Sequence, residues 1–156
     1  MHRHFTATGF VMDGERTLLL WHPRLQMWVP PGGHLLPDED PVTAVLREIE
    51  EETGLQAAVL PLAPVFPFDY PGQVQPPYTI LIERSAEPGE PHQHIDLIYF
   101  CRPLPGSRLA PPAGTVLCWA TEEELRQGRP LEMDGTCGLA VPVPADVRAL
   151  ALEGFR

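Results

Sequence analysis

The sequence contains no lysine, and all 11 of its basic residues are arginines. This absence excludes Schiff-base chemistry through a lysine amine and the phosphate-binding lysine of a P-loop. Positive charge as a whole is scarce, because 21 acidic residues leave a formal net charge of −10. Surfaces that bind nucleic acid need an excess of lysine and arginine, so no nucleic-acid partner is expected. If the ligand is nonetheless a phosphate, a metal ion must mediate its binding.

Cysteines and long apolar runs are also few. Cys101, Cys118 and Cys137 lie far apart and form no CxxC pair, which indicates neither a disulfide framework nor a zinc site. No apolar run approaches the roughly 20 residues that span a membrane, and the N-terminus lacks the apolar core of a signal peptide. We therefore expect a cytoplasmic protein without a membrane partner, and a length of 156 residues indicates one domain over 1–156.

Acidic residues are abundant, and they concentrate in the stretch 33–55. Asp40 followed by Pro41 is a helix start signal and Gly54 is a matching stop, which predicts a helix over 41–53. At about 100° per residue, the apolar side chains of this helix fall on one face and three glutamates on another. The apolar face consists of Val42, Val45, Leu46 and Ile49. The acidic face consists of Glu48, Glu51 and Glu52.

The three glutamates repel one another because they are three and four positions apart on the helix. Each such like-charge pair costs a helix about 0.2–0.5 kcal/mol, and Arg47 offsets only part of that cost. A divalent cation would reverse the sign of the energy, since Mg²⁺ is commonly held by carboxylates together with substrate phosphates. Judged on these three residues alone, a solvated acidic helix face is the alternative.

The spacing of the neighbouring residues favours the cation. The stretch reads G-x5-E-x7-R-E-I-x-E-E-x-G-L, with seven specified identities and two aliphatic positions. It matches without a departure the signature of the Nudix hydrolase family, which the chain therefore resembles over these 23 residues. The preceding sequence WVPPG at 28–32 also resembles the family's approach to this motif. The signature positions are Gly33, Glu39, Arg47, Glu48, Ile49, Glu51, Glu52, Gly54 and Leu55.

The resemblance implies a metal-dependent pyrophosphohydrolase, in which water attacks phosphorus in a nucleoside diphosphate linked to another group. By position in the motif, the ligands of Mg²⁺ or Mn²⁺ look like Glu48, Glu51 and Glu52 with the carbonyl group of Gly33. Arg47 joins the three glutamates in the catalytic set. Structural support of the site is assigned to Gly32, Glu39 and Gly54, with Glu39 and Arg47 bracing the loop and the helix.

The general base and two alternative functions are left open by the resemblance. The candidates for the base are Glu48, Glu83, Glu87 and Glu90, because many family members use a glutamate from a distant loop. A Nudix domain that senses nucleotides without cleaving them often carries a DNA-binding region or has lost acids from the motif, and this sequence shows neither feature. Isomerisation of an allylic diphosphate needs a positioned cysteine and further acids that we cannot place.

Strand-like patterns surround the predicted helix. Apolar runs over 5–12 and 17–21 flank a turn signal and predict a hairpin, and further strands are expected over 56–60, 79–84, 95–102 and 115–120. A capping box at Thr121 predicts a short helix through Arg126, and a closing helix is expected over 145–152. Strands on both sides of one helix, followed by a second, make an α/β fold. The resemblance implies the Nudix-type α/β/α sandwich with a mixed, curved β-sheet.

Substrate contacts are expected outside the motif. Side chains alternate along a strand, so His92, His94 and Asp96 should share one face. Their separation of about 7 Å argues against a shared transition metal ion, and substrate contact or plain surface is favoured. The predicted substrate-binding residues are Arg24, Trp28, Tyr70, His94 and Asp96.

The proline-rich loop before the strand at 79–84 carries three aromatic residues, Phe68, Tyr70 and Tyr78. Their rings either stack on a nucleobase or pack the loop onto the body of the protein. The expected partner is a small-molecule nucleotide, and nucleoside triphosphates, ADP-ribose, nucleotide sugars and dinucleoside polyphosphates all fit. A homodimer is left open.

Overall fold

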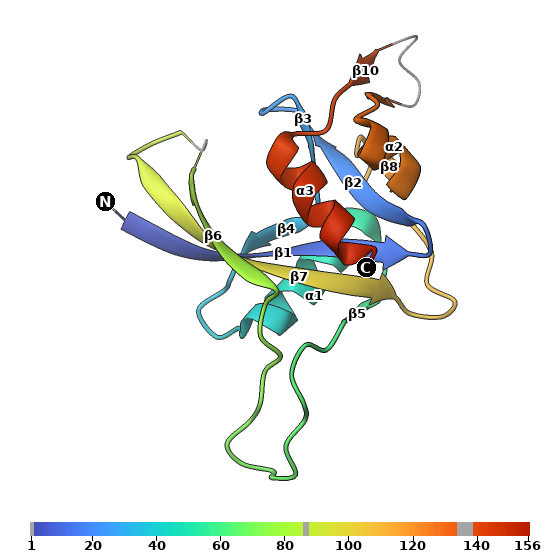
Figure 1. Cartoon of the computed structure of the whole chain (residues 1–156). Coiled ribbons are helices and arrows are strands. Elements are labelled where there is room, and N and C mark those ends of the chain that lie inside the picture. Colours follow the sequence, from blue (N-terminus) through green and yellow to red (C-terminus); the bar gives the residue numbers. More distant parts are fainter. Residues whose placement is uncertain (1, 86–87, 134–138) are drawn as a thin grey trace.

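A mixed β-sheet runs through the middle of the molecule, with helices on both of its faces (Figure 1). The structure is a computed structural model and describes residues 2–85, 88–133 and 139–156. Within these ranges, the eight strands of the sheet are β1 (His2–Asp13), β2 (Arg16–His22), β3 (Met27–Val29), β4 (Gly32–His34), β5 (Ala57–Val59), β6 (Thr79–Arg84), β7 (His92–Pro103) and β8 (Leu117–Thr121). The helices are α1 (Pro41–Thr53), α2 (Glu122–Gln127) and α3 (Ala145–Gly154). The predicted α/β/α sandwich is confirmed.

The strands pair in the order β3-β2-β1-β7-β5, while β4 pairs with β1, β6 with β7 and β8 with β2. The predicted hairpin of β1 and β2 is confirmed, with Met12 opposite Thr17. The long strands β1 and β7 run parallel, from His2 opposite His92 to Val11 opposite Cys101. This pairing begins β7 three residues before the predicted start at residue 95, because the first residues of β1 offer hydrogen-bond partners there.

Helix α1 begins and ends where its capping signals predict. The Asp40 carboxylate accepts a hydrogen bond from the Thr43 N–H at 2.9 Å, and Gly54 ends the helix with a φ of 79°. The buried face is rotated from the predicted one, because α1 packs closely over Gly9 of β1, where a Cβ atom would lie 2.8 Å from Ile49. The buried residues are Ala44, Val45, Ile49 and Thr53, whereas Val42 and Leu46 are half-buried.

Two hydrophobic cores lie on opposite faces of the sheet, since side chains alternate along β1 and β7. One core joins α1 to Ala7, Val11, Leu18, Tyr99 and Cys101. The other joins α2 and α3 to Phe10, Leu19, Trp28, Ile98 and Phe100. Helices therefore cover both faces of the sheet, and the apolar side chains of β1 and β7 are buried beneath them on either side.

The C-terminal part contains the predicted capping box and a short ribbon. The Thr121 side chain accepts from the Glu124 N–H, while the Glu124 carboxylate accepts from the Thr121 N–H. Strands β9 (Leu131–Glu132) and β10 (Ala140–Val141) pair antiparallel. Cys137 lies outside the described residues. Among the helices that the structure describes, none has the length and apolar character needed to cross a membrane.

Candidate active site

Glu48, Glu51 and Glu52 lie along one side of α1, and we call these three residues the acidic ridge. The ridge contacts the short strand β4. The carboxylate of Glu52 accepts a hydrogen bond from the backbone N–H of Gly32 at 2.9 Å. The helix and the glycine pair of the motif are therefore held together by a direct bond.

Arg47 neutralises part of the ridge and fixes the loop before it. Its Nε and Nη2 groups donate to both carboxylate oxygens of Glu39 at 2.7 and 2.8 Å, and Nη1 donates to Glu48 at 3.0 Å and to Glu51 at 3.2 Å. Nη2 also donates to the carbonyl oxygen of His34 at 3.1 Å. The hydrogen bond from Arg47 holds the pKa of Glu39 below its ordinary value. One guanidinium group thus ties β4, the following loop and α1 together.

The surroundings of Glu52 disfavour its ionised form. Burial raises the pKa of Glu52 to about 7, and repulsion from Glu48 and Glu51 adds to the effect, although the Gly32 hydrogen bond opposes it. A cation beside the ridge would reverse this shift, because an opposite charge within a few ångströms favours the ionised carboxylate.

The backbone of β4 passes close to the ridge, and Gly33 leaves room there for the Glu48 carboxylate. A Cβ atom at Gly33 would lie 2.3 Å from the Oε1 atom of Glu48. At the far end of α1, a Cβ atom at Gly54 would lie 2.5 Å from the backbone nitrogen of Ala110. Gly54 therefore permits a close backbone approach that a larger residue would block, whereas a larger residue at Gly33 would displace the Glu48 carboxylate.

The donor set of the ridge suits a hard divalent cation, since Mg²⁺ and Mn²⁺ prefer carboxylate and carbonyl oxygens. The carboxylates point to different partners in this structure: Glu52 accepts from Gly32, whereas Glu48 and Glu51 accept from Arg47. To share one cation, they would have to turn from these partners.

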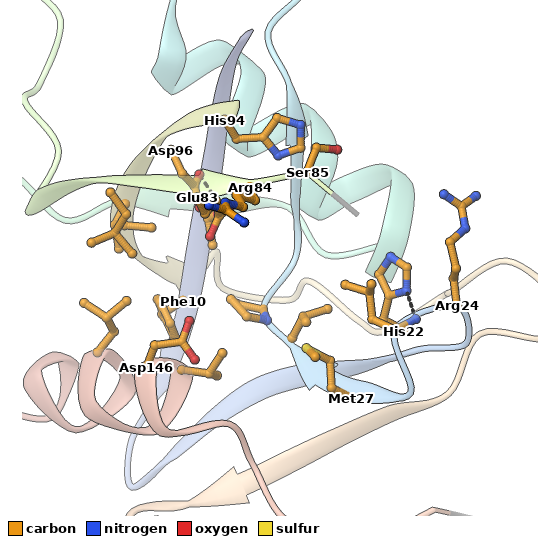
Figure 2. A pocket seen from close by; sticks show the side chains of 18 residues that line it. Phe10, His22, Arg24, Met27, Glu83, Arg84, Ser85, His94, Asp96 and Asp146 are labelled. Carbon is orange, nitrogen blue, oxygen red and sulfur yellow. Dashed lines mark hydrogen bonds between the residues drawn. The ribbon is translucent and has the colours of Figure 1, made fainter. Parts of the chain in front are cut away.

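A cavity of about 420 Å³ lies on the sheet face opposite α1, between the sheet, the β2–β3 connection and α3 (Figure 2). Val29 and Pro30 line it and lead directly into Gly32. Thr8 also lines the cavity and pairs in register with Gly32. The cavity therefore borders the strand and the residues that adjoin Gly32, the residue that contacts the acidic ridge.

A pair of carboxylates, Asp96 and Glu83, lies on one wall of this cavity beside His94 (Figure 2). Asp96 is only 5% exposed and accepts hydrogen bonds from the hydroxyl groups of Thr6 and Thr8 at 3.0 and 2.9 Å. Burial raises the pKa of Glu83 to about 7, and the charge of Asp96 adds to the shift. Burial also raises the pKa of Asp96. When Glu83 is protonated, its hydroxyl group can donate a hydrogen bond to the Asp96 carboxylate.

Three of the five predicted substrate-binding residues line the cavity, namely Arg24, His94 and Asp96. Trp28 has no exposed surface and packs against Trp21 in the core, which corrects the expectation of a substrate contact. The reason is the alternation along β3, which turns the Trp28 side chain into the sheet core.

Tyr70 is also remote from the cavity. It is 88% exposed on the segment 61–78, which projects from the body of the molecule between β5 and β6 (Figure 1). At the end of this segment, the ring of Tyr78 packs on Phe100 at 5.0 Å and its hydroxyl donates to Glu153 at 2.8 Å. Tyr78 thus packs the loop onto the body, whereas Phe68 stacks on Phe66 within the loop itself.

The candidates for the general base are spread over the molecule. Glu48 lies on the ridge, Glu83 lines the cavity, and Glu90 is exposed on the connection between β6 and β7. Glu87 lies outside the described residues.

The expectation that His92 and His94 lie too far apart to share a metal ion is wrong, because their rings lean toward each other. Their ring centroids are 5.2 Å apart, and His34 from β4 joins them, so that one ring nitrogen from each of the three histidines lies within 4.8 Å of the others. Asp96 does not take part in this group, because Thr6 and Thr8 hold its carboxylate.

Sequence reasoning missed His34, Thr6 and Thr8. The alternation of polar residues at the start of β1 was a usable signal for the two threonines, since Thr6 and Thr8 fall on the same face as His4. No local signal reports that β4 pairs with this part of β1, which is what brings His34 to the group.

A family model described as NUDIX domain matches residues 2–135. Over 30 residues, the chain is 60% identical to an m7GpppN-mRNA hydrolase from Bos taurus, a match that covers 19% of this chain and only 10% of that protein. It is 27% identical over 127 residues to a MutT-like protein from Streptomyces ambofaciens, covering 81% of this chain and 69% of the relative.

A solved structure of a NUDIX family hydrolase from Clostridium perfringens resembles the whole fold. The TM-score is 0.73 at 22% sequence identity, covering 99% of this chain and 97% of that chain. At this level of identity, the likeness supports the architecture and leaves the substrate undecided.

Proposed function

This chain belongs to the Nudix hydrolase family, and we propose that it is a metal-dependent pyrophosphohydrolase that cleaves a nucleoside diphosphate linked to another group. The observation that supports the proposal best is the position of the acidic ridge. It carries every carboxylate of the family motif except Glu39, and its Glu52 accepts a hydrogen bond from Gly32, two residues after Pro30 in the wall of the 420 Å³ cavity.

The residues that would hold the cation are Glu48, Glu51, Glu52 and the carbonyl group of Gly33. When bound, Mg²⁺ or Mn²⁺ neutralises charge on the diphosphate, orients it and acidifies a water molecule. Release of Glu48 and Glu51 from Arg47 would leave the guanidinium group on Glu39, so that the loop and α1 stay joined while the carboxylates turn.

The cavity suits the organic part of the substrate. Its volume falls within the range of about 300–1,000 Å³ that small-molecule sites occupy. Phe10, Leu81 and Ile98 form an apolar wall, and Asp96 with Glu83 provides a hydrogen-bond acceptor and donor beside it. Arg24, across the cavity, offers a guanidinium group to a phosphate oxygen.

The test is a panel of nucleoside triphosphates, ADP-ribose, a nucleotide sugar and a dinucleoside polyphosphate, incubated with Mg²⁺, with Mn²⁺ or with a chelator. Products are separated by chromatography. We expect turnover of at least one class with a divalent cation only. Glu51→Gln and Glu52→Gln should lower that activity more than about 100-fold, since even outer contacts of metal ligands account for 10–100-fold.

The matched control is Glu50→Gln, because Glu50 lies on the same helix but is exposed and outside the ridge. It should keep its activity. Full activity in both ridge variants, or turnover in chelator, would contradict the proposal. Binding of a nucleotide without any turnover would instead support a sensing function.

A further inference from the structure

Three histidines from two strands meet at one end of the sheet, and we call His34, His92 and His94 the histidine cluster. One ring nitrogen from each of the three lies within 4.8 Å of the other two. The ring of His34 meets that of His94 edge-on at a centroid distance of 4.8 Å, and His92 and His94 are 5.2 Å apart. All three side chains are half-buried.

We propose that the histidine cluster binds a divalent transition metal ion of borderline softness, with Zn²⁺ as the representative. Neutral imidazole nitrogen is a preferred donor for Zn²⁺, Co²⁺ and Ni²⁺, whereas Mg²⁺ prefers oxygen ligands. This site is separate from the acidic ridge, which offers only oxygen atoms. It requires nothing from the proposed hydrolase activity.

The backbone geometry favours this assignment. β1 pairs with β4 on one side and with β7 on the other, which fixes the Cα positions of all three histidines. In a tetrahedral site with Zn–N bonds of about 2.0–2.1 Å, ligand nitrogens lie about 3.4 Å apart. The nitrogens, now up to 4.8 Å apart, would have to approach one another by about 1.4 Å, and rotation of the imidazole rings about their side-chain bonds can supply such a shift.

The surroundings of His92 resemble those of a metal ligand. Its Nδ1 atom lies 3.2 Å from the carbonyl oxygen of Glu90, and a ring N–H bonded to a backbone carbonyl commonly orients a metal-binding histidine. In this tautomer, Nε2 carries the lone pair. The Nε2 atoms of His92 and His94 are shielded from solvent.

A fourth position is available beside the cluster. The ring of His4 lies 4.9 Å from that of His92 and 5.7 Å from that of His34. Because His4 is exposed, its nitrogen or a water molecule can complete a tetrahedral set. We therefore expect the loss of His4 to weaken binding less than the loss of a member of the cluster.

The experiment is a calorimetric titration of Zn²⁺ into the full chain with excess Mg²⁺ present, so that the acidic ridge is occupied. We expect one Zn²⁺ per chain. Co²⁺ should give the absorption bands of a tetrahedral, nitrogen-bound ion. In His34→Ala and His92→Ala, the affinity for Zn²⁺ should fall more than about 100-fold, because a lost ligand should exceed the 10–100-fold effect of an outer contact.

Two control variants test whether the histidine cluster itself holds the ion. His22→Asn keeps an acceptor oxygen where His22 Nδ1 now accepts a hydrogen bond from the Leu25 N–H, and it should bind Zn²⁺ like the original chain. If His34→Ala does not fold, His34→Asn, which keeps a polar side chain at this position, takes its place. Thermal unfolding shows whether each variant is folded. Binding that Mg²⁺ displaces, or that survives in every cluster variant, would overturn the proposal. Either outcome leaves the hydrolase assignment untouched, since the readout is metal affinity and not turnover.

Discussion

Two carboxylates on different elements, Glu52 on α1 and Glu83 on β6, both have a pKa raised to about 7 by burial, but their surroundings differ. Glu52 stands among other acids, with one backbone N–H as a partner. Glu83 lies beside Asp96, whose carboxylate accepts hydrogen bonds from two threonine hydroxyl groups. The first environment is relieved by a cation and the second by a proton. The ridge therefore suits metal and phosphate, whereas the cavity pair suits a neutral hydrogen-bonding group.

The largest effect is expected where the backbone meets the ridge. Gly33→Ala places a Cβ atom 2.3 Å from Oε1 of Glu48, so the carboxylate or β4 must move. Hydrolysis should fall more than about 100-fold, as for loss of a ligand, while the cavity pair stays intact. Steady-state kinetics measures this loss of activity, with the substrate that the nucleotide panel identifies. Gly72→Ala is the control, because nothing lies within 4 Å of a Cβ atom there, and equal activity in both variants would refute the prediction.

An intermediate effect is expected from the residue that partly neutralises the ridge. Arg47→Ala removes the clamp on Glu39 and leaves the ridge acids without their cationic partner. We expect activity to fall about 10–100-fold and the midpoint of thermal unfolding to drop.

The matched control for Arg47 is Arg126→Ala, which breaks an exposed ion pair of the same i, i+4 type with Glu122. Its effect on unfolding should stay within about 0.5 kcal/mol. Scanning calorimetry compares the unfolding midpoints of the two variants, and steady-state kinetics compares their rates of hydrolysis. Equal destabilisation by the two substitutions would show that Arg47 is an ordinary surface arginine.

The smallest effect concerns the cavity pair and pH. The pKa of Glu83 rises from 4.5 to about 7 on folding, so the folded state binds more protons than the unfolded state between these values. The free energy of unfolding should therefore decrease as pH rises from 4.5 to about 7 and then level off. Because Glu83 is partly exposed, its share should stay below about 1 kcal/mol.

Glu83→Gln removes the carboxyl group that titrates and should flatten the dependence of the unfolding free energy on pH. Denaturant unfolding at several pH values measures this slope. Since Glu83 and Asp96 titrate together, the slope belongs to the pair. Glu50→Gln, on the exposed side of α1, should leave the slope as it is. If the slope is the same in Glu83→Gln, another group takes up the proton on folding, and the prediction is wrong.

Much of the fold could be read from short-range signals. The bounds of α1 follow from Asp40, Pro41 and Gly54, because capping depends on residues within one turn. The alternation in β7 placed His94 and Asp96 on one face for the same reason, since strand geometry is local. The rotated core face of α1 could not be read in this way, because it depends on the gap that Gly9 leaves in a strand far along the chain.

The order of residues along the chain accounts for the motif, the helix that carries the acidic ridge and the family to which the protein belongs. Long-range packing accounts for the rest: the burial of Trp28, the distance of Tyr70 from the cavity, the pairing of Glu83 with Asp96, and the meeting of His34 with His92 and His94. Each of these depends on which strands pair and on which side a segment folds back. Such choices arise from the summed burial and hydrogen bonding of the whole sheet, and no short stretch of sequence contains them.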